Sequence, residues 1–183
     1  MKNSVLALSL LALLPFAASA ADGVSYTYVE GGYLKTNVDG PDADGWALKG
    51  SAAIHPNFHL FGEFDRQDVD NVNADFDHWR AGVGYNLPVS PNADLLARVA
   101  YEKYDAGAFD TDGYSAEVGV QGSLLPNLNG YALAGYEDGD DYDGDYYGRL
   151  GAQYKFTANW SASADVKFAD GDTQWFVGPR LSW

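Results

Sequence analysis

Two groups of residues have types and spacings that could do chemistry. The first is DGDDYDGD at 138–145, in which five carboxylates stand among glycines. Clustered carboxylate oxygens suit a hard cation such as Ca²⁺. The stretch lacks the ligand order and the terminal bidentate Glu of the helix–loop–helix calcium motif, and no helical pattern flanks it. We therefore expect a solvated loop here and no tightly bound metal.

The second group surrounds His78, which follows Asp77 and falls at the same end of the predicted fold as Asp112 and Asp145. A histidine held by a carboxylate can activate water, so this group could belong to a hydrolase. No nucleophile elbow, phosphate loop or zinc-ligand spacing accompanies it. His55 and His59 fall near the opposite end and cannot share a site with it. We expect a histidine without a catalytic role, no enzyme and no cofactor.

The elements that position these residues are short segments with a period of two, which is typical of β-strands. Most are nine to eleven residues long, the length that a tilted strand needs to cross a bilayer. They begin near Ser25, Gly45, Phe58, His78, Leu95, Gly113, Gly130, Tyr146, Trp160 and Thr173.

The connections alternate between two kinds. Short turns without an acid lie at 55–57, 87–93, 125–129 and 157–159, and longer acidic loops such as TNVDGPDAD and QDVDNVNADFD lie between them. Antiparallel neighbours put alternate connections at opposite ends of a sheet. All acidic loops therefore belong to one rim and all short turns to the other.

The two faces of the strands have opposite character. One parity is free of charge, as in Trp46, Leu48, Gly50, Ala52 and Ile54. The other parity carries seven bases and seven acids, which we expect to form a paired network inside the barrel: Glu30, Lys49, Glu63, Asp65, Arg80, Arg98, Glu102, Glu117, Glu137, Arg149, Lys155, Asp165, Lys167 and Arg180. The alternation in the first segment does not show which parity points inward. We place Glu30 inside by analogy with AYEKY and GYEDG.

A charged inside with an apolar outside is the inverted pattern of a membrane barrel. Aromatic residues concentrate near both ends of the outward faces, as expected for interfacial girdles. All five tryptophans fall in these girdles: Trp46, Trp79, Trp160, Trp175 and Trp183. The sequence predicts an all-β protein, a closed antiparallel transmembrane β-barrel with ten strands, or eight as the alternative.

The start of the chain predicts export. Residues 1–20 combine Lys2, an apolar run and small residues at Ala18 and Ala20, which is typical of a secretory signal peptide cleaved after Ala20. One barrel domain, residues 21–183, would remain, with ten of the eleven basic residues against 26 acidic residues and a net charge of −16. Such a charge excludes nucleic acid as a partner. The chain has no cysteine, so no disulfide stabilises it.

The last residues favour membrane assembly. Gly178, Leu181 and Trp183 match the terminal signal of bacterial outer-membrane barrels, although Phe176 stands where that signal has a polar residue. We expect the last strand to pair with the first, which removes the free edges, and to be recognised by the barrel assembly machinery.

Several stretches also resemble a known family. SYTYVEGGYLKT, ARVAYEKYDAG, YGRLGAQYKF and ADVKFADGDTQWFVGPRLSW are similar to small bacterial outer-membrane proteins of the OmpA/OmpX-like barrel superfamily, once described as secreted activators of plant immunity and quorum factors. The resemblance implies an outer-membrane barrel. The signalling description concerns an amino-terminal segment that corresponds to residues 21–40, with Tyr26 as the matching tyrosine.

The sequence therefore favours a small integral outer-membrane protein with a structural or surface-interaction role. The expected partners are the lipid bilayer and lipopolysaccharide, with divalent cations loosely bridging the acidic loops to lipopolysaccharide phosphates. A narrow, porin-like pore, a hydrolase at the rim and a secreted signalling factor remain as alternatives.

Overall fold

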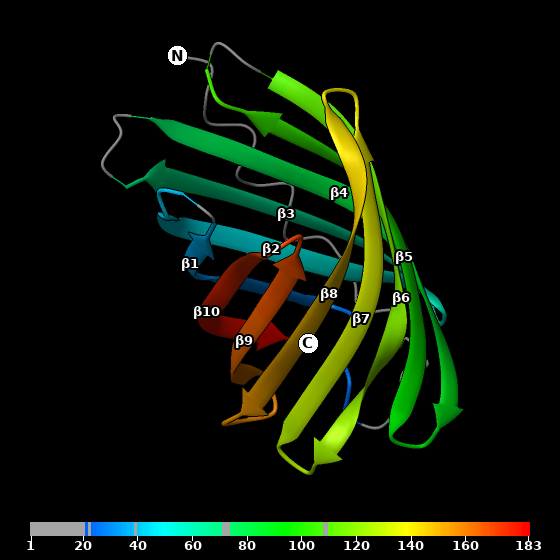
Figure 1. Cartoon of the computed structure of the whole chain (residues 1–183). Helices are drawn as coiled ribbons and strands as arrows, with labels where there is room; N and C mark the ends of the chain where they lie inside the picture. Colours follow the sequence, from blue (N-terminus) through cyan, green and yellow to red (C-terminus); the bar gives the residue numbers. More distant parts are fainter. Residues whose placement is uncertain (1–20, 22, 39, 71–73, 108–109) are drawn as a thin grey trace, which may run out of the picture.

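The alternating segments form a closed antiparallel barrel in the computed structural model, which describes residues 21, 23–38, 40–70, 74–107 and 110–183 (Figure 1). Its strands are β1 (Tyr28–Asn37), β2 (Ala43–His55), β3 (Phe58–Val69), β4 (Asp75–Ser90), β5 (Ala93–Asp105), β6 (Asp110–Leu125), β7 (Leu128–Gly139), β8 (Tyr142–Lys155), β9 (Trp160–Ala169) and β10 (Asp172–Ser182). Each strand pairs with its sequence neighbours, and β1 pairs with β10. The prediction of a ten-stranded all-β barrel is confirmed.

Strand lengths differ from the predicted nine to eleven residues. The strands contain 10 to 16 residues, with the longest, β4 and β6, at 16. They extend into segments that the composition assigned to loops, because antiparallel neighbours continue to exchange hydrogen bonds beyond the apolar belt. The turn expected at 87–93 is likewise shorter, since β4 continues to Ser90.

The first predicted segment begins too early. Residues from Ser25 to Thr27 are not part of a strand, and the ladder with β2 and β10 begins at Tyr28. Tyr26 is nevertheless buried, at 4% exposure. Because the inward-pointing Tyr26 comes just before the alternating residues of β1, the sequence pattern extends beyond the true start of the strand.

One hairpin shows how local sequence fixes a turn. Asp170 and Gly171 join β9 to β10 with positive φ values of 38° and 88°, and Ala169 pairs directly with Asp172. Two central residues with positive φ make the type I′ turn that suits the twist of a hairpin, and Asp-Gly is a favoured sequence for it.

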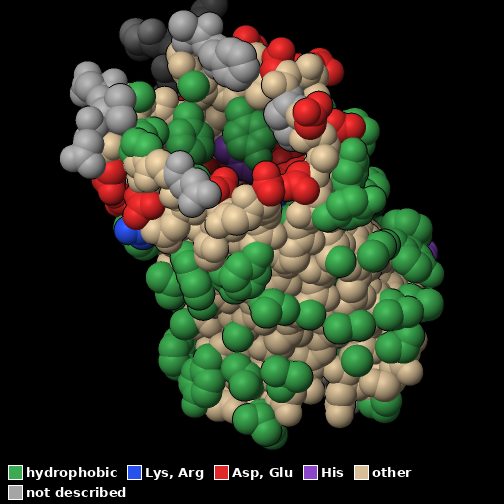
Figure 2. Space-filling view, viewed as in Figure 1, with side chains coloured by type: hydrophobic (Ala, Val, Ile, Leu, Met, Phe, Trp, Pro, Cys, Tyr) green, Lys and Arg blue, Asp and Glu red, His purple; other side chains and the backbone are tan. Residues whose placement is uncertain are grey.

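The outer wall is apolar below the acidic rim. Figure 2 shows red carboxylates gathered at one end of the molecule and hydrophobic side chains over the wall below them. The tryptophans at 46, 79, 160, 175 and 183 are all about half exposed. Among the described residues, no helix is long and apolar enough to span a membrane.

Strand register aligns opposite charges across the inner wall. Neighbouring strands place Arg180, Glu30, Lys49, Glu63, Arg80 and Glu102 opposite one another, from β10 through β1 to β5. Their signs alternate at every step. Directly opposed unlike charges stabilise a sheet, whereas like charges destabilise it. The register therefore matches the charge pattern of the inner face.

Candidate functional site

The centre of the lumen is organised around Arg80 on β4. Its guanidinium lies 3.0 Å from the Glu102 carboxylate, 3.1 Å from that of Glu117 and 3.8 Å from that of Glu63. These acids come from β5, β6 and β3, and all four side chains point inward because of the period of two. One cation thus connects four strands.

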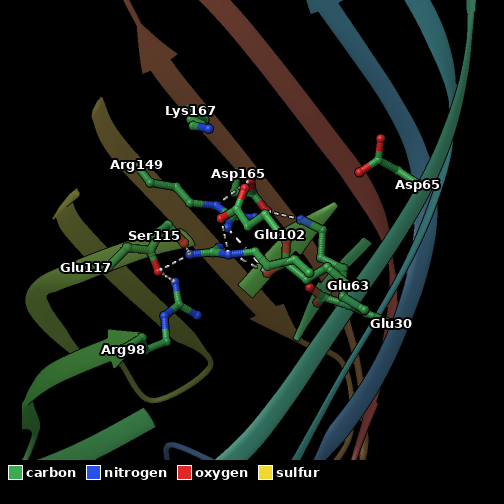
Figure 3. A network of polar contacts seen from close by, with 12 residues as sticks. Glu30, Glu63, Asp65, Arg98, Glu102, Ser115, Glu117, Arg149, Asp165 and Lys167 are labelled. Carbon is green, nitrogen blue, oxygen red and sulfur yellow. Dashed lines mark hydrogen bonds and ion pairs between the residues drawn. The ribbon is translucent and has the colours of Figure 1, made fainter. Parts of the chain in front are cut away.

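Three further bases, Arg98, Arg149 and Lys49, complete this cluster. Figure 3 shows most of the cluster, with Arg98 and Arg149 labelled. Arg98 Nη2 lies 2.6 Å from Glu117 Oε2, and Arg149 contacts Glu63 at 3.4 Å and Asp165 at 3.2 Å. Lys49 Nζ lies 2.7 Å from Asp165 Oδ2. Because Lys49 and Asp165 come from β2 and β9, the contacts cross the lumen and do not only follow the wall.

The other predicted charges lie above or below this cluster. Arg180 contacts Glu30 at 3.7 Å, which puts Glu30 inside, and Lys167 contacts Glu137 at 2.5 Å. Lys155 differs from the expectation, since it donates to the Gly23 carbonyl. It lies at the end of β8 near the short turns, where the described residues bring no carboxylate within ion-pair distance.

Neutral side chains fill the space between the charges. Ser115 Oγ and Tyr147 Oη accept from Arg80 at 3.0 and 3.3 Å. The Phe61 ring lies 5.4 Å from the Arg80 guanidinium and 5.2 Å from that of Arg98, within the range of a cation–π contact. The two central cavities have volumes of only about 30 and 20 Å³, room for a few water molecules.

A wider vestibule of about 210 Å³ opens toward the acidic loops and includes His78 in its wall. Nδ1 of His78 lies 2.9 Å from Asp65, Nε2 lies 3.3 Å from Glu102, and the ring stacks on Tyr104. Ionised carboxylates only accept hydrogen bonds, so both contacts are hydrogen bonds only when both ring nitrogens carry a proton. His78 therefore connects the vestibule to the central cluster, and each of its ring nitrogens faces a carboxylate.

The acids expected near His78 lie elsewhere. Asp77 forms a two-point contact with Arg66 on the rim, at 2.5 and 2.6 Å, and Asp112 lies 4.0 Å from Lys103. His78 therefore does not form a site with the carboxylates of the rim. The sequence could not show this, because Asp65 and Glu102 approach His78 through the register of β3, β4 and β5.

The acidic loop at 138–145 has local partners. Asp138 accepts hydrogen bonds from the hydroxyls of Tyr114 and Tyr136 at 3.0 and 3.4 Å, and Asp140 and Asp141 are exposed. Across the described ranges, no group of three or more His, Cys, Asp or Glu residues has the geometry to hold a metal ion.

Aromatic rings pack together at both edges of the apolar wall. Near the acidic rim, Phe64 lies between Trp46 and Trp79, with ring centroids 5.2 and 4.2 Å apart. Near the short turns, Phe58 packs on Tyr85 at 5.1 Å. Neighbouring strands thus build continuous aromatic patches at both ends of the wall.

The residues of the terminal signal lie at the closure between β1 and β10. A side chain at Gly178 would place its Cβ 2.2 Å from the Gly31 carbonyl oxygen, so the two strands require a glycine there. Leu181 pairs with Val29. The backbone N–H of Trp183 donates to the Thr27 carbonyl at 3.2 Å.

Sequence reasoning missed the amino-terminal segment, defined here as residues 21 and 23–27. This segment enters the lumen at the short-turn end, where Tyr26 stacks on His59 and contacts the buried Asp94. In the sequence, Asp94 directly follows the short turn predicted at 87–93. An acid among otherwise uncharged turn sequences is the signal that could have identified it.

Comparison with known proteins finds similarity over most of the chain. Residues 4–176 match the family model described as an outer membrane protein beta-barrel domain. The KdgM porin, solved in complex with disordered oligogalacturonate, is 15% identical and covers 87% of this chain and 99% of its own, with a TM-score of 0.50.

Two further solved structures are similar to this chain over most of its length. The translocator domain of the autotransporter NalP from Neisseria meningitidis is 12% identical, with coverages of 90% and 91% and a TM-score of 0.49. The attachment invasion locus protein Ail of Yersinia pestis is 12% identical, with coverages of 87% and 99% and a TM-score of 0.42. No curated protein sequence matches the chain.

Proposed function

Because this chain belongs to the outer membrane protein beta-barrel family, we propose that it is a non-enzymatic surface barrel with a closed lumen and a structural or surface-interaction role. The ion-paired cluster around Arg80 carries this proposal. The Arg149–Glu63 pair within it joins β8 to β3 on the opposite wall, and the cluster leaves central cavities of about 30 and 20 Å³. A solute larger than water would have to break buried ion pairs to pass.

The charge balance of the cluster supports closure over selective transport. Selective pores present rings of one charge sign to the passing ion. Here each central acid contacts a base, for example Glu117 with Arg98 and Asp165 with Lys49. Buried charges persist when they are paired and hydrogen-bonded, which favours a rigid filling.

The acidic loops form the surface that partners would meet. Barrels of this kind have short periplasmic turns and longer extracellular loops, so the acidic rim would face outward. A strongly acidic rim beside lipopolysaccharide phosphates requires bridging cations, and the exposed Asp140 and Asp141 suit loose bridging by divalent ions.

A narrow pore is the second candidate, and the 210 Å³ vestibule favours it. The vestibule shares no lining residue with the 30 Å³ central cavity, which argues for a dead end. The hydrolase hypothesis is weaker, because both nitrogens of His78 contact carboxylates. A soluble secreted form would expose the apolar wall to water, where large apolar patches promote association.

Cysteine accessibility on intact cells tests the proposed orientation. The chain lacks cysteine, so single substitutions give clean labels. Ala106→Cys lies in an exposed acidic-loop segment and Ala158→Cys in an exposed short turn. A polyethylene-glycol maleimide too large to cross the outer membrane should label only Ala106→Cys, while lysed cells should show labelling at both. Labelling of Ala158→Cys alone on intact cells would reverse the orientation.

A further inference from the structure

The amino-terminal segment is anchored inside the barrel by its backbone. Ser51 Oγ donates to the Tyr26 carbonyl at 2.7 Å, Asn129 Nδ2 donates to the Gly23 carbonyl at 2.8 Å and Arg180 Nη2 donates to the Ser25 carbonyl at 3.2 Å. The side chain of Tyr26 packs in an apolar cluster with Ala53, Leu96 and Leu133. Strands from several sides of the barrel thus hold one short stretch of chain.

Asp94 receives the beginning of this segment. Its carboxylate accepts from the backbone nitrogen of Ala21 at 3.0 Å through Oδ1 and at 3.2 Å through Oδ2, and from the Tyr26 hydroxyl at 2.9 Å. Asp94 is 0% exposed and Ala21 is 4% exposed. Both carboxylate oxygens are therefore directed at the nitrogen of one residue.

Asp94 differs from the other buried acids of the lumen. Glu30, Glu63, Glu102, Glu117 and Asp165 each contact an arginine or lysine, and the buried Asp65 contacts His78. Within the described ranges, no basic side chain forms an ion pair with Asp94. A buried carboxylate without a cation is costly, so the site needs a positive charge.

We propose that Asp94 is the binding site for the α-ammonium group of the mature chain. Cleavage by a signal peptidase after Ala20 would consume one water molecule, leave a carboxylate on Ala20 and turn the Ala21 amide nitrogen into a protonated amine. That nitrogen already lies within hydrogen-bond distance of both Asp94 oxygens. Its single N–H would become three donors with a positive charge, and charge-assisted hydrogen bonds are the stronger kind.

Signal-peptide cleavage and docking of the amino-terminal segment are coupled in this arrangement. The ion pair exists only after cleavage, so only the mature chain supplies the cation that the buried Asp94 lacks. The docked segment then occupies part of the short-turn end of the lumen, beside a cavity of about 300 Å³. The inference rests on the expected cleavage after Ala20 and is independent of whether the central cluster blocks ions.

Chemical labelling of the α-amine tests the pairing in the folded mature protein. The amine is acylated with an N-hydroxysuccinimide ester near neutral pH, and its modification is measured by mass spectrometry of the amino-terminal peptide. Folded wild type should react at least about tenfold more slowly than unfolded chain, because a charged, hydrogen-bonded amine is not nucleophilic. Asp94→Asn keeps the shape and one acceptor but removes the charge, and should react at close to the unfolded rate.

Matched variants separate the ion pair from packing. Tyr26→Phe keeps the carboxylate and the ring, and Asp138→Asn removes an acid from the rim, so both should keep the protection of wild type. If Asp94→Asn folds, as shown by heat-dependent gel mobility, and stays as protected as wild type, packing alone buries the amine and the proposal is wrong.

A second variant decides the question if Asp94→Asn does not fold. Adding Gly-Ser before Ala21 leaves Asp94 intact and turns the Ala21 nitrogen back into an amide. Hydrogen exchange of the backbone amides at 23–27 should then accelerate by about tenfold, as for loss of one charged hydrogen bond. Unchanged exchange would overturn the proposal.

Discussion

Arg98 and Glu117 face each other on β5 and β6 and form a 2.6 Å ion pair in which the Glu117 side chain is fully buried. Arg80 contacts the same carboxylate at 3.1 Å. Glu117 thus lies between two guanidinium groups. Removal of either arginine would leave this buried carboxylate with only one of its two ion pairs.

Arg98→Ala should therefore destabilise the barrel by about 3 kcal/mol, the scale of breaking a buried ion pair. The measurement is urea unfolding in lipid vesicles, followed by tryptophan fluorescence. The control is Lys103→Ala, which removes a rim pair whose side chains are 38% and 68% exposed and should cost less than about 1 kcal/mol. Equal costs for the two variants would mean that the lumen is hydrated.

The lipid-facing wall should reject charge. Val118 points outward at 61% exposure and pairs with Ala134 on β7. Val118→Arg should cost about 2–4 kcal/mol near the bilayer midplane, whereas Ala106→Arg in the exposed acidic-loop segment should be nearly neutral. The same unfolding assay measures both. Similar tolerance at the two sites would show that the strand faces are assigned the wrong way round.

The carboxyl end should control insertion. Trp183 lies at the edge of the wall near the short turns, and its backbone donates to Thr27. Deleting it removes an interfacial aromatic anchor, so the exported chain should accumulate without the heat-dependent gel mobility of a folded barrel. Trp183→Phe keeps an aromatic ring at this position and should insert like wild type. If the deletion variant inserts like wild type, Trp183 is not part of the assembly signal.

His78 should matter for stability and not for hydrolysis. His78→Ala leaves Asp65 and Glu102 without the ring that connects them, and should destabilise by about 1–3 kcal/mol because polar groups lose their partner. His55→Ala, at an exposed position near the short turns, should change stability by less than about 0.5 kcal/mol. Any peptide hydrolysis by wild type that His78→Ala abolishes would contradict the non-enzymatic role.

Strand number and strand faces could be predicted because both depend on local information. A period of two marks the inner and outer residues of each strand, and alternation of acidic loops with short turns fixes which end is which. Trp46 and Lys49 illustrate this, since opposite parity in β2 puts one ring on the wall and one amine in the lumen.

Partners across the lumen could not be predicted in the same way. Lys49 on β2 meets Asp165 on β9, although β1 and β10 lie between these strands, and His78 meets Asp65 and Glu102. These contacts depend on the stagger between strands and on which side chains are long enough to span the barrel. No periodicity within one strand contains that information.

The amino-terminal segment was misjudged for a related reason. SYTY alternates like the strand that follows it, yet the ladder begins only at Tyr28. Burial of Tyr26 against Leu96 and Leu133 gives a non-strand segment the same pattern as a strand. Tertiary contacts, and not the local pattern, determine that this segment is not a strand.

Planar-bilayer conductance tests the closed lumen most directly. Purified wild type should show almost no steady current, because paired charges and rings fill the centre. Arg80→Ala combined with Arg149→Ala removes both bases that contact Glu63 and should produce small, cation-preferring currents, since unpaired carboxylates would remain. Arg66→Ala on the rim should stay silent. A large, steady wild-type conductance that the double substitution does not change would contradict the closed barrel.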